Sequence, residues 1–158
     1  MKKFLTLLLS LSFIFSFSNL CFSETVSDVE RQVSYTYFED GSYFVSVISD
    51  ENNSQQTRSS TTVTKSKTST YYSSNDTALW YVKVTGEFTY GNGTAICNSA
   101  NVSAGSYVSV WTVSNKSASK TGSSATAKAT GKLYQSGMLV TTINKTVTLT
   151  CDSKGNFS

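Results

Sequence analysis

Few side chains of this 158-residue sequence could carry out chemistry, and their types exclude several classes of enzyme. There is no histidine, which excludes serine–histidine and cysteine–histidine nucleophilic sites and imidazole metal sites. Carboxylate pairs that could serve acid–base catalysis occur at Glu39-Asp40 and Asp50-Glu51. Adjacent carboxylates in turns are usually only solvated, and no convergent group is visible near them. We therefore expect a protein that is not an enzyme and has no metal site and no cofactor.

The first 23 residues have the organisation of a secretory signal peptide. A basic start precedes an almost wholly apolar run over 4–17, and the small residues Cys21 and Ser23 suit cleavage before Glu24. The apolar run is shorter than the ~20 residues that a membrane span needs. Acylation of Cys21 would require a small residue before it, and Leu20 is not small. We expect a bacterial protein that is secreted into the extracellular space, with no membrane attachment after cleavage.

Removal of the signal peptide leaves Cys97 and Cys151 as the cysteines of the mature chain. An even number of cysteines in an oxidising compartment is typical of disulfide bonding. The sequence therefore predicts one disulfide, between Cys97 and Cys151.

Lysines and a tyrosine in the second half of the chain form a possible ligand surface. Residues 77–158 contain seven lysines and two acids. Lys128, Lys132 and Tyr134 share the solvent-facing phase of one predicted strand, and Lys116 and Lys120 lie in a polar stretch that we interpret as the flanking loop. Such a surface could attract an anionic wall polymer or an acidic glycan. The alternative is that these lysines only keep the sheet soluble and its edges unpaired.

Nucleic acid is not an expected partner, because the charge of the mature chain is close to balanced. After residue 23 there are eleven basic and ten acidic side chains, a net charge of 11 − 10 = +1. Proteins that bind nucleic acid usually carry a strongly basic balance.

Aromatic side chains offer a second possible contact surface. Tyr81 and Tyr107 fall in solvent-facing phases, where tyrosine could stack on sugars or contact a protein partner. The alternative is that they are ordinary cross-strand residues of a sheet. Trp80 and Trp111 are expected in the core, because a sheet interior built from alanine and threonine needs large side chains to fill it.

The strands that would position these residues are clearest between Trp80 and Val102. Apolar and polar residues alternate up to Tyr90, and Asn92-Gly93 then supplies the turn of a hairpin. A two-residue turn predicts Phe88 opposite Cys97 and Val84 opposite Asn101, with Cys97 facing the core. A three-residue loop would instead turn Cys97 outward.

The rest of the mature chain is expected to add further strands to a single domain, 24–158. Residues 24–49 are interpreted as an acidic hairpin around Asp40-Gly41, and 50–76 as a polar connection or an edge strand. Residues 77–158 would form the core sheets, with a strand over 107–113, a polar stretch over 115–124, and small residues alternating over 125–133. No segment after the signal peptide has helical periodicity. The expected fold is an all-β antiparallel sandwich or a curved barrel of about seven to eight strands.

Three segments of the chain resemble small secreted proteins of clostridial-type bacteria that carry a domain of unknown function. The segments are ALWYVKVTGEFTYGNGTAICNSA, SNKSASKTGSSATAKATGK and TVTLTCDSKGNFS. The resemblance covers about residues 62–158. It implies secretion and an all-β fold, and it implies no activity.

Together these features favour a non-catalytic binding or interaction protein at the bacterial surface or its surroundings. Its ligand would be a glycan, an anionic wall polymer or a protein. The alternative is a structural or self-assembling envelope component, and an enzyme that uses a carboxylate pair is less favoured.

Overall fold

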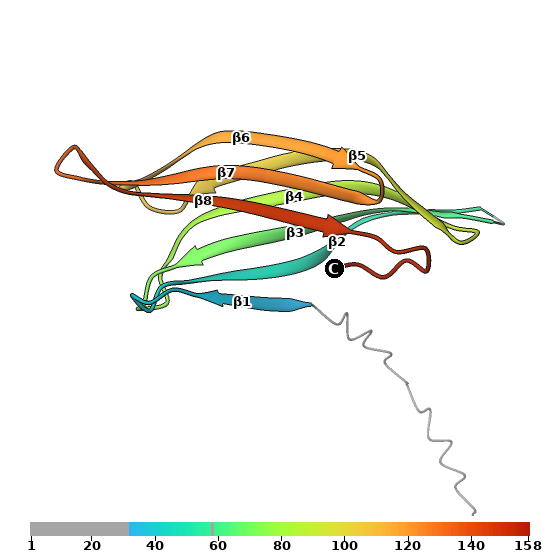
Figure 1. The fold of residues 1–158 in the computed structure, drawn as a ribbon, viewed down its shortest axis with the longest axis horizontal. Helices are drawn as coiled ribbons and strands as arrows, with labels where there is room; N and C mark the ends of the chain where they lie inside the picture. The colour runs from blue at the N-terminus through green and yellow to red at the C-terminus, as the bar shows by residue number, and fades with distance from the viewer. Residues whose placement is uncertain (1–31, 58) are drawn as a thin grey trace, which may run out of the picture.

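The computed structural model describes residues 32–57 and 59–158, and over this part the chain is an all-β sandwich of eight strands (Figure 1). The predicted fold class is thus confirmed, whereas the signal peptide lies outside the described residues. Both sheets are antiparallel. The first sheet has the order β1 (Val33–Tyr37), β2 (Tyr43–Gln56), β3 (Thr61–Tyr72), β4 (Ala78–Gly91), β5 (Thr94–Ser106). The second has the order β6 (Trp111–Thr121), β7 (Ser124–Gln135), β8 (Met138–Thr150).

The β4–β5 hairpin has the predicted turn but a different register along its length. Asn92 and Gly93 both have positive φ, 52° and 77°, which is the backbone that a tight two-residue hairpin turn requires. Phe88 pairs with Cys97, and Cys97 is buried, as predicted. A bulge between Glu87 and Phe88 then shifts the pairing by one, so that Val84 faces Val102. The predicted pairing of Val84 with Asn101 is therefore wrong.

The polar segment 50–76 was expected to be a connection or an edge strand, but most of it belongs to two inner strands of the first sheet. Residues 50–56 continue β2, and β3 lies between β2 and β4 with hydrogen-bonded partners on both sides. The prediction took the threonine- and serine-rich composition of this segment as a sign of a connection. β-Branched threonine instead favours strands, and the ladders to β2 and β4 satisfy the backbone of β3. A polar strand can therefore occupy the centre of a sheet.

The sequence predicted that the first strand of the second sheet begins earlier than it does. The strand expected over 107–113 begins only at Trp111, and the segment 115–124 that was expected to be a connection is most of β6 and its turn into β7. The prediction of a connection rested on the polar composition of 115–124, and these polar residues belong to a strand that is mostly exposed, with a register shift between Ser114 and Ser117.

The core between the sheets combines large side chains from the first sheet with small ones from the second. Trp80 is fully buried and stacks on Trp111 at 6.2 Å between ring centroids, which confirms the core prediction for both tryptophans. Gly131 of β7 lies directly under Trp80, where a Cβ atom would come within 2.5 Å of the indole. Small residues on β7 therefore make the space that the large residues of β4 occupy. The buried small residues of β7 are Ala125, Ala127, Ala129 and Gly131.

The second sheet covers only part of the first. β8 packs on β3 and β4, and it reaches β2 through Lys145, whose ammonium lies 4.1 Å from the centre of the Phe44 ring. The residues of β1 are exposed along the whole strand, whereas Phe44 on the inner face of β2 is buried. No helix long and apolar enough to cross a membrane was found among residues 32–57 and 59–158.

Candidate functional site

The outer face of the five-stranded sheet carries a row of four tyrosines, Tyr35, Tyr37, Tyr43 and Tyr72, which we call the tyrosine tract. Tyr37 pairs with Tyr43, and Tyr43 pairs with Tyr72, on successive strands. Directly paired residues of antiparallel strands project from the same face. The intervening residues face the core instead, as buried Phe44 shows.

The rings of the tyrosine tract form one continuous aromatic surface. The ring centroids of Tyr37 and Tyr43 are 5.4 Å apart, and those of Tyr43 and Tyr72 are 5.2 Å apart. Tyr35 and Tyr37 lie parallel at 6.1 Å. Because β1 is the edge strand, Tyr35 and Tyr37 remain 57% and 68% exposed. Their ring faces are thus accessible to a ligand.

A hydrogen bond fixes the middle of the tract. The Tyr43 hydroxyl donates to Asp76 Oδ1 at 2.9 Å. This hydrogen bond to a carboxylate, with smaller contributions from desolvation and nearby charge, raises the pKa of Tyr43 from 10.0 to about 12. Asp76 itself lies in the β3–β4 turn with a positive φ of 59°. The turn therefore holds the carboxylate beside the tract.

The predicted contact residues Tyr81 and Tyr107 form a separate pair on the same face. Their ring centroids lie 5.4 Å apart. Tyr81 lies over Gly105, its partner on β5, and Tyr107 is 56% exposed. The sequence prediction named this pair but missed the tyrosine tract. The Tyr-x-Tyr spacing at 35–37 was a visible signal, but the other two tyrosines join it only through strand pairing.

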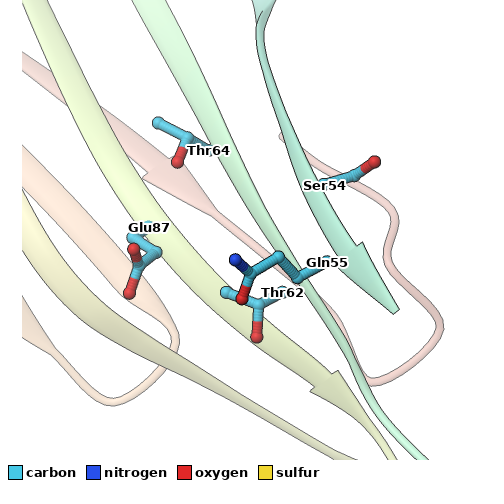
Figure 2. Close-up of a pocket in the computed structure, with 5 residues that line it drawn as sticks. All are labelled: Ser54, Gln55, Thr62, Thr64 and Glu87. Carbon is cyan, nitrogen blue, oxygen red and sulfur yellow. The ribbon is translucent and has the colours of Figure 1, made fainter. Parts of the chain in front are cut away.

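A polar pocket of about 360 Å³ lies near the opposite end of the same sheet (Figure 2). Gln55, Thr62 and Thr64 line it from β2 and β3, and Glu87 lines it from β4. In Figure 2 the side chain of Ser54 points away from the other four, in keeping with its pairing to inward-facing Val63. The pocket thus offers hydroxyl, amide and carboxylate groups together.

Glu87 of this pocket accepts a hydrogen bond from Asn98 Nδ2 at 3.2 Å. The same amide donates to Thr89 Oγ1 at 2.8 Å, and Thr89 in turn contacts the Thr62 hydroxyl at 2.8 Å. The carboxylate is exposed and belongs to a chain of polar groups that crosses three strands. It is therefore placed to accept hydrogen bonds from a polar ligand.

The predicted lysine surface lies on the second sheet and is only partly assembled. Lys128 and Lys132 follow the same outward phase of β7, and Tyr134 lies next along it. Thr130 between them is buried and donates to Asn144 Oδ1 at 2.8 Å. Because a strand rises about 3.3 Å per residue, the two lysines lie roughly 13 Å apart along β7.

Lys116 and Lys120 do not lie in a loop beside this surface, as the sequence predicted, but within β6. Lys120 pairs with Ala125, whose side chain is buried on the inner face. The ammonium group of Lys120 donates a hydrogen bond to the Asn98 carbonyl of β5 at 2.5 Å. Lys116 is exposed at the β6 bulge. Alternation across the bulge therefore separates Lys120 from the surface to which it was assigned.

The two cysteines are buried free thiols at the same corner of the sandwich. The backbone N–H of Cys97 donates to Gly122 O at 2.8 Å, and that of Cys151 to Ser123 O at 3.0 Å. Burial raises the pKa of the Cys151 thiol to about 11, and the charges of Asp152 and Cys97 add to this shift. The fold brings the predicted partners close together, and the bridge itself stays a prediction.

Three of the four carboxylates considered for acid–base chemistry, Asp40, Asp50 and Glu51, have structural partners. Asp50 pairs with Lys65, whereas Glu51 accepts from Lys83 at 2.5 Å and from Ser66 at 2.7 Å. The hydrogen bond from Lys83 lowers the pKa of Glu51 most, and the hydrogen bond from Ser66 lowers it further.

Within the turn before β2, Asp40 accepts from the backbone and side chain of Ser42. No group of three or more metal-ligating side chains occurs in the described part of the chain.

No family model, curated protein or solved structure matches this chain.

Proposed function

We propose that this protein is a secreted, non-catalytic binding protein that holds a neutral glycan on the outer face of its five-stranded sheet. The observation that carries the proposal is the tyrosine tract. Four tyrosine rings on three neighbouring strands lie with centroids 5.2–6.1 Å apart from one neighbour to the next, and two of them are more than half exposed. The C–H faces of sugars pack on aromatic rings, and the tyrosine hydroxyls supply hydrogen bonds at the same surface.

The polar pocket supports an extended rather than a single-sugar ligand. It occupies the same outer face as the tract, and Tyr72 and Thr64 mark the two regions on β3. Their separation of eight residues corresponds to about 26 Å at the rise of a strand. Between them the surface is polar, with the Lys83–Glu51 pair. A linear glycan could therefore stack at one end and donate hydroxyl hydrogen bonds to Glu87 at the other.

A glycan array with neutral sugars tests this proposal. We expect binding to a neutral oligosaccharide that falls at least tenfold in Tyr35→Ala/Tyr37→Ala, with an unchanged melting temperature because both rings lie mostly in solvent. The matched control is Tyr134→Ala on the second sheet, which should bind like the original protein. Absence of binding to every neutral glycan, or an equal loss in the control, would contradict the proposal.

An anionic wall polymer is a second candidate ligand, favoured by the charge of the second sheet. Residues 111–150 contain five lysines and no acidic side chain. Binding to purified anionic wall polymer at low salt should weaken as salt rises. Lys128→Glu/Lys132→Glu should abolish it, whereas Lys154→Glu, outside the sheet, should have a small effect. Binding that ignores salt or the double change would exclude this surface.

A further inference from the structure

The strand β1 is an edge of the first sheet. Within residues 32–57 and 59–158 it pairs with β2 alone, and it lies at the margin of the sheet (Figure 1). All of its residues are exposed, and Val33, Tyr35 and Tyr37, which share the outer face, are 46%, 57% and 68% exposed. An edge strand presents backbone N–H and C=O groups with which another strand can pair.

Hydrogen bonds at both ends of β1 show which of its backbone groups are used by β2. Before the strand, Ile48 N donates to Gln32 O at 3.2 Å, and after it Phe38 N donates to Ser42 O at 2.9 Å. In an antiparallel pair, residues that bond to the neighbouring strand alternate with residues that do not. The even-numbered residues of β1 therefore bond to β2.

The odd-numbered residues of β1 point their backbone groups away from β2. These residues are Val33, Tyr35 and Tyr37, and each carries one N–H and one C=O group on the open side of the strand. They are spaced symmetrically about Tyr35. The open side of β1 is therefore complementary to itself when a second β1 runs antiparallel to it.

The other edges of the two sheets carry features that keep edge strands from pairing. On β8, Lys145 points inward, over an aromatic ring of the core. On β6 there are a bulge and two lysines, Lys116 and Lys120. On β5, the backbone N–H of Cys97 is bonded to the β6–β7 turn. By contrast, β1 has no charged residue, no proline and no bulge, and only its length of five residues limits pairing.

We propose that β1 pairs with β1 of a second copy of this chain, antiparallel and about a twofold axis at Tyr35. In this register Tyr35 faces Tyr35 of the second copy, and Val33 faces Tyr37. Every outward N–H group then meets an outward C=O group. The same residues serve on both copies, as in the isologous interface of a twofold dimer.

The side chains of β1 also suit this pairing. Aromatic residues facing each other, as at Tyr35, and an aromatic residue facing a β-branched one, as at Val33 and Tyr37, are favourable cross-strand pairs. No like charges are brought together, because β1 is uncharged. The dimer would join the two five-stranded sheets and place their tyrosine tracts side by side. The proposal goes beyond glycan binding and does not depend on it.

Sedimentation equilibrium of the mature chain without any sugar tests the dimer. Because β1 is short, the interface is small, and small interfaces usually form transient complexes. We therefore expect the mass to rise from that of one chain toward that of two as the protein concentration increases. A single chain at every concentration up to about 1 mM would overturn the proposal, including the case in which the edge serves a different protein.

Backbone hydrogen exchange tests which groups form the interface. The amides of Val33, Tyr35 and Tyr37 should exchange quickly in dilute solution and at least tenfold more slowly when the protein is concentrated. The amides of Ser34 and Thr36, which bond to β2, are the internal control and should not depend on concentration. Protection of the odd-numbered amides already in the dilute monomer would mean that another part of the same chain covers this edge, and it would overturn the proposal.

Charge variants at Tyr35 test the twofold register. Tyr35→Lys and Tyr35→Glu each place like charges opposite each other, so each should raise the dissociation constant of its dimer at least tenfold. An equal mixture of the two should form a heterodimer. Tyr35→Phe is the matched control and should dimerise like the original protein. The melting temperature of each variant at low concentration should stay close to the original, because Tyr35 lies mostly in solvent. Dimers of both charged variants, or a mixture that stays monomeric, would show that the proposed pairing is wrong.

Discussion

Tyr43 is the residue of the tyrosine tract whose chemistry differs most from that of a free tyrosine. Its hydroxyl donates to Asp76, and the pKa of Tyr43 is raised to about 12. The Asp76 carboxylate gains a partner, and the Tyr43 ring lies between those of Tyr37 and Tyr72. One hydrogen bond therefore connects the β3–β4 turn to the aromatic surface.

This raised pKa predicts how stability depends on alkaline pH. The folded protein keeps the Tyr43 proton to about pH 12, whereas the unfolded chain releases it near pH 10. The stabilisation is therefore complete below pH 10 and is lost as the pH rises toward 12. Tyr43→Phe should show a smaller loss of stability over this interval. Ultraviolet absorbance should find one late-ionising tyrosine that is absent in Tyr43→Phe, and its absence from the original protein would contradict the assignment.

Gly131 is a second position where a single residue controls packing. A Cβ atom there would lie 2.5 Å from Trp80 Cε2, and Trp80 is fully buried. Gly131→Ala should destabilise the protein by about 1–3 kcal/mol, the usual cost of overpacking a core. The gain from a stiffer unfolded chain, about 0.4–1 kcal/mol, is too small to offset it. Denaturant unfolding measures the difference.

The control for Gly131→Ala is Lys132→Ala, the next residue, which projects from the opposite face of β7. Its free energy of unfolding should stay within about 0.5 kcal/mol of the original value. A Gly131→Ala protein as stable as this control would mean that Trp80 can move aside without cost.

At the scale of elements, the two cysteines bring a strand of the first sheet and the end of the second sheet to the same corner of the core. Cys97 lies on β5 and Cys151 directly after β8, and each donates its backbone N–H to the β6–β7 turn. A disulfide here would link the two sheets at one corner of the sandwich.

We expect the secreted protein to contain a Cys97–Cys151 disulfide. The enclosed loop of 151 − 97 = 54 residues corresponds to about 4 kcal/mol of stabilisation from chain entropy. Cys97→Ser should lower the melting temperature, and reducing agent should lower that of the original protein but not that of the variant. Mass mapping without reduction should find the linked peptides. Two free thiols in the native secreted protein would disprove the bridge.

At the scale of the whole molecule, the two sheets differ in composition and in the surfaces that they present. The five-stranded sheet has tyrosines and a polar pocket on its outer face. The three-stranded sheet contains every lysine of residues 111–150 and no acid. The two sheets therefore present different chemical groups to solvent.

Export of the whole chain is a prediction that depends on its first residues. We expect culture supernatant to contain a species whose intact mass begins at Glu24, because the basic start and apolar run favour cleavage there. A variant with charged residues inside the run 4–17 should remain in the cells. A membrane-bound species that carries acyl mass on Cys21 would contradict this prediction.

The sequence alone was sufficient for the features that depend on neighbouring residues. Alternation and Asn92-Gly93 predicted the β4–β5 hairpin, the pairing of Phe88 with Cys97 and the burial of Cys97, because turn chemistry fixes register close to the turn. The all-β class and the buried tryptophans followed from the same local patterns.

The tertiary structure decided what depends on bulges and on distant strand pairs. A single extra residue on β5, Asn98, moved Val84 opposite Val102, and the β6 bulge separated Lys120 from Lys128. Bulges leave little sequence signal because they need only one residue of irregular backbone. The tyrosine tract joins residues from β1, β2 and β3, and only the order of these strands and their register bring the four rings together.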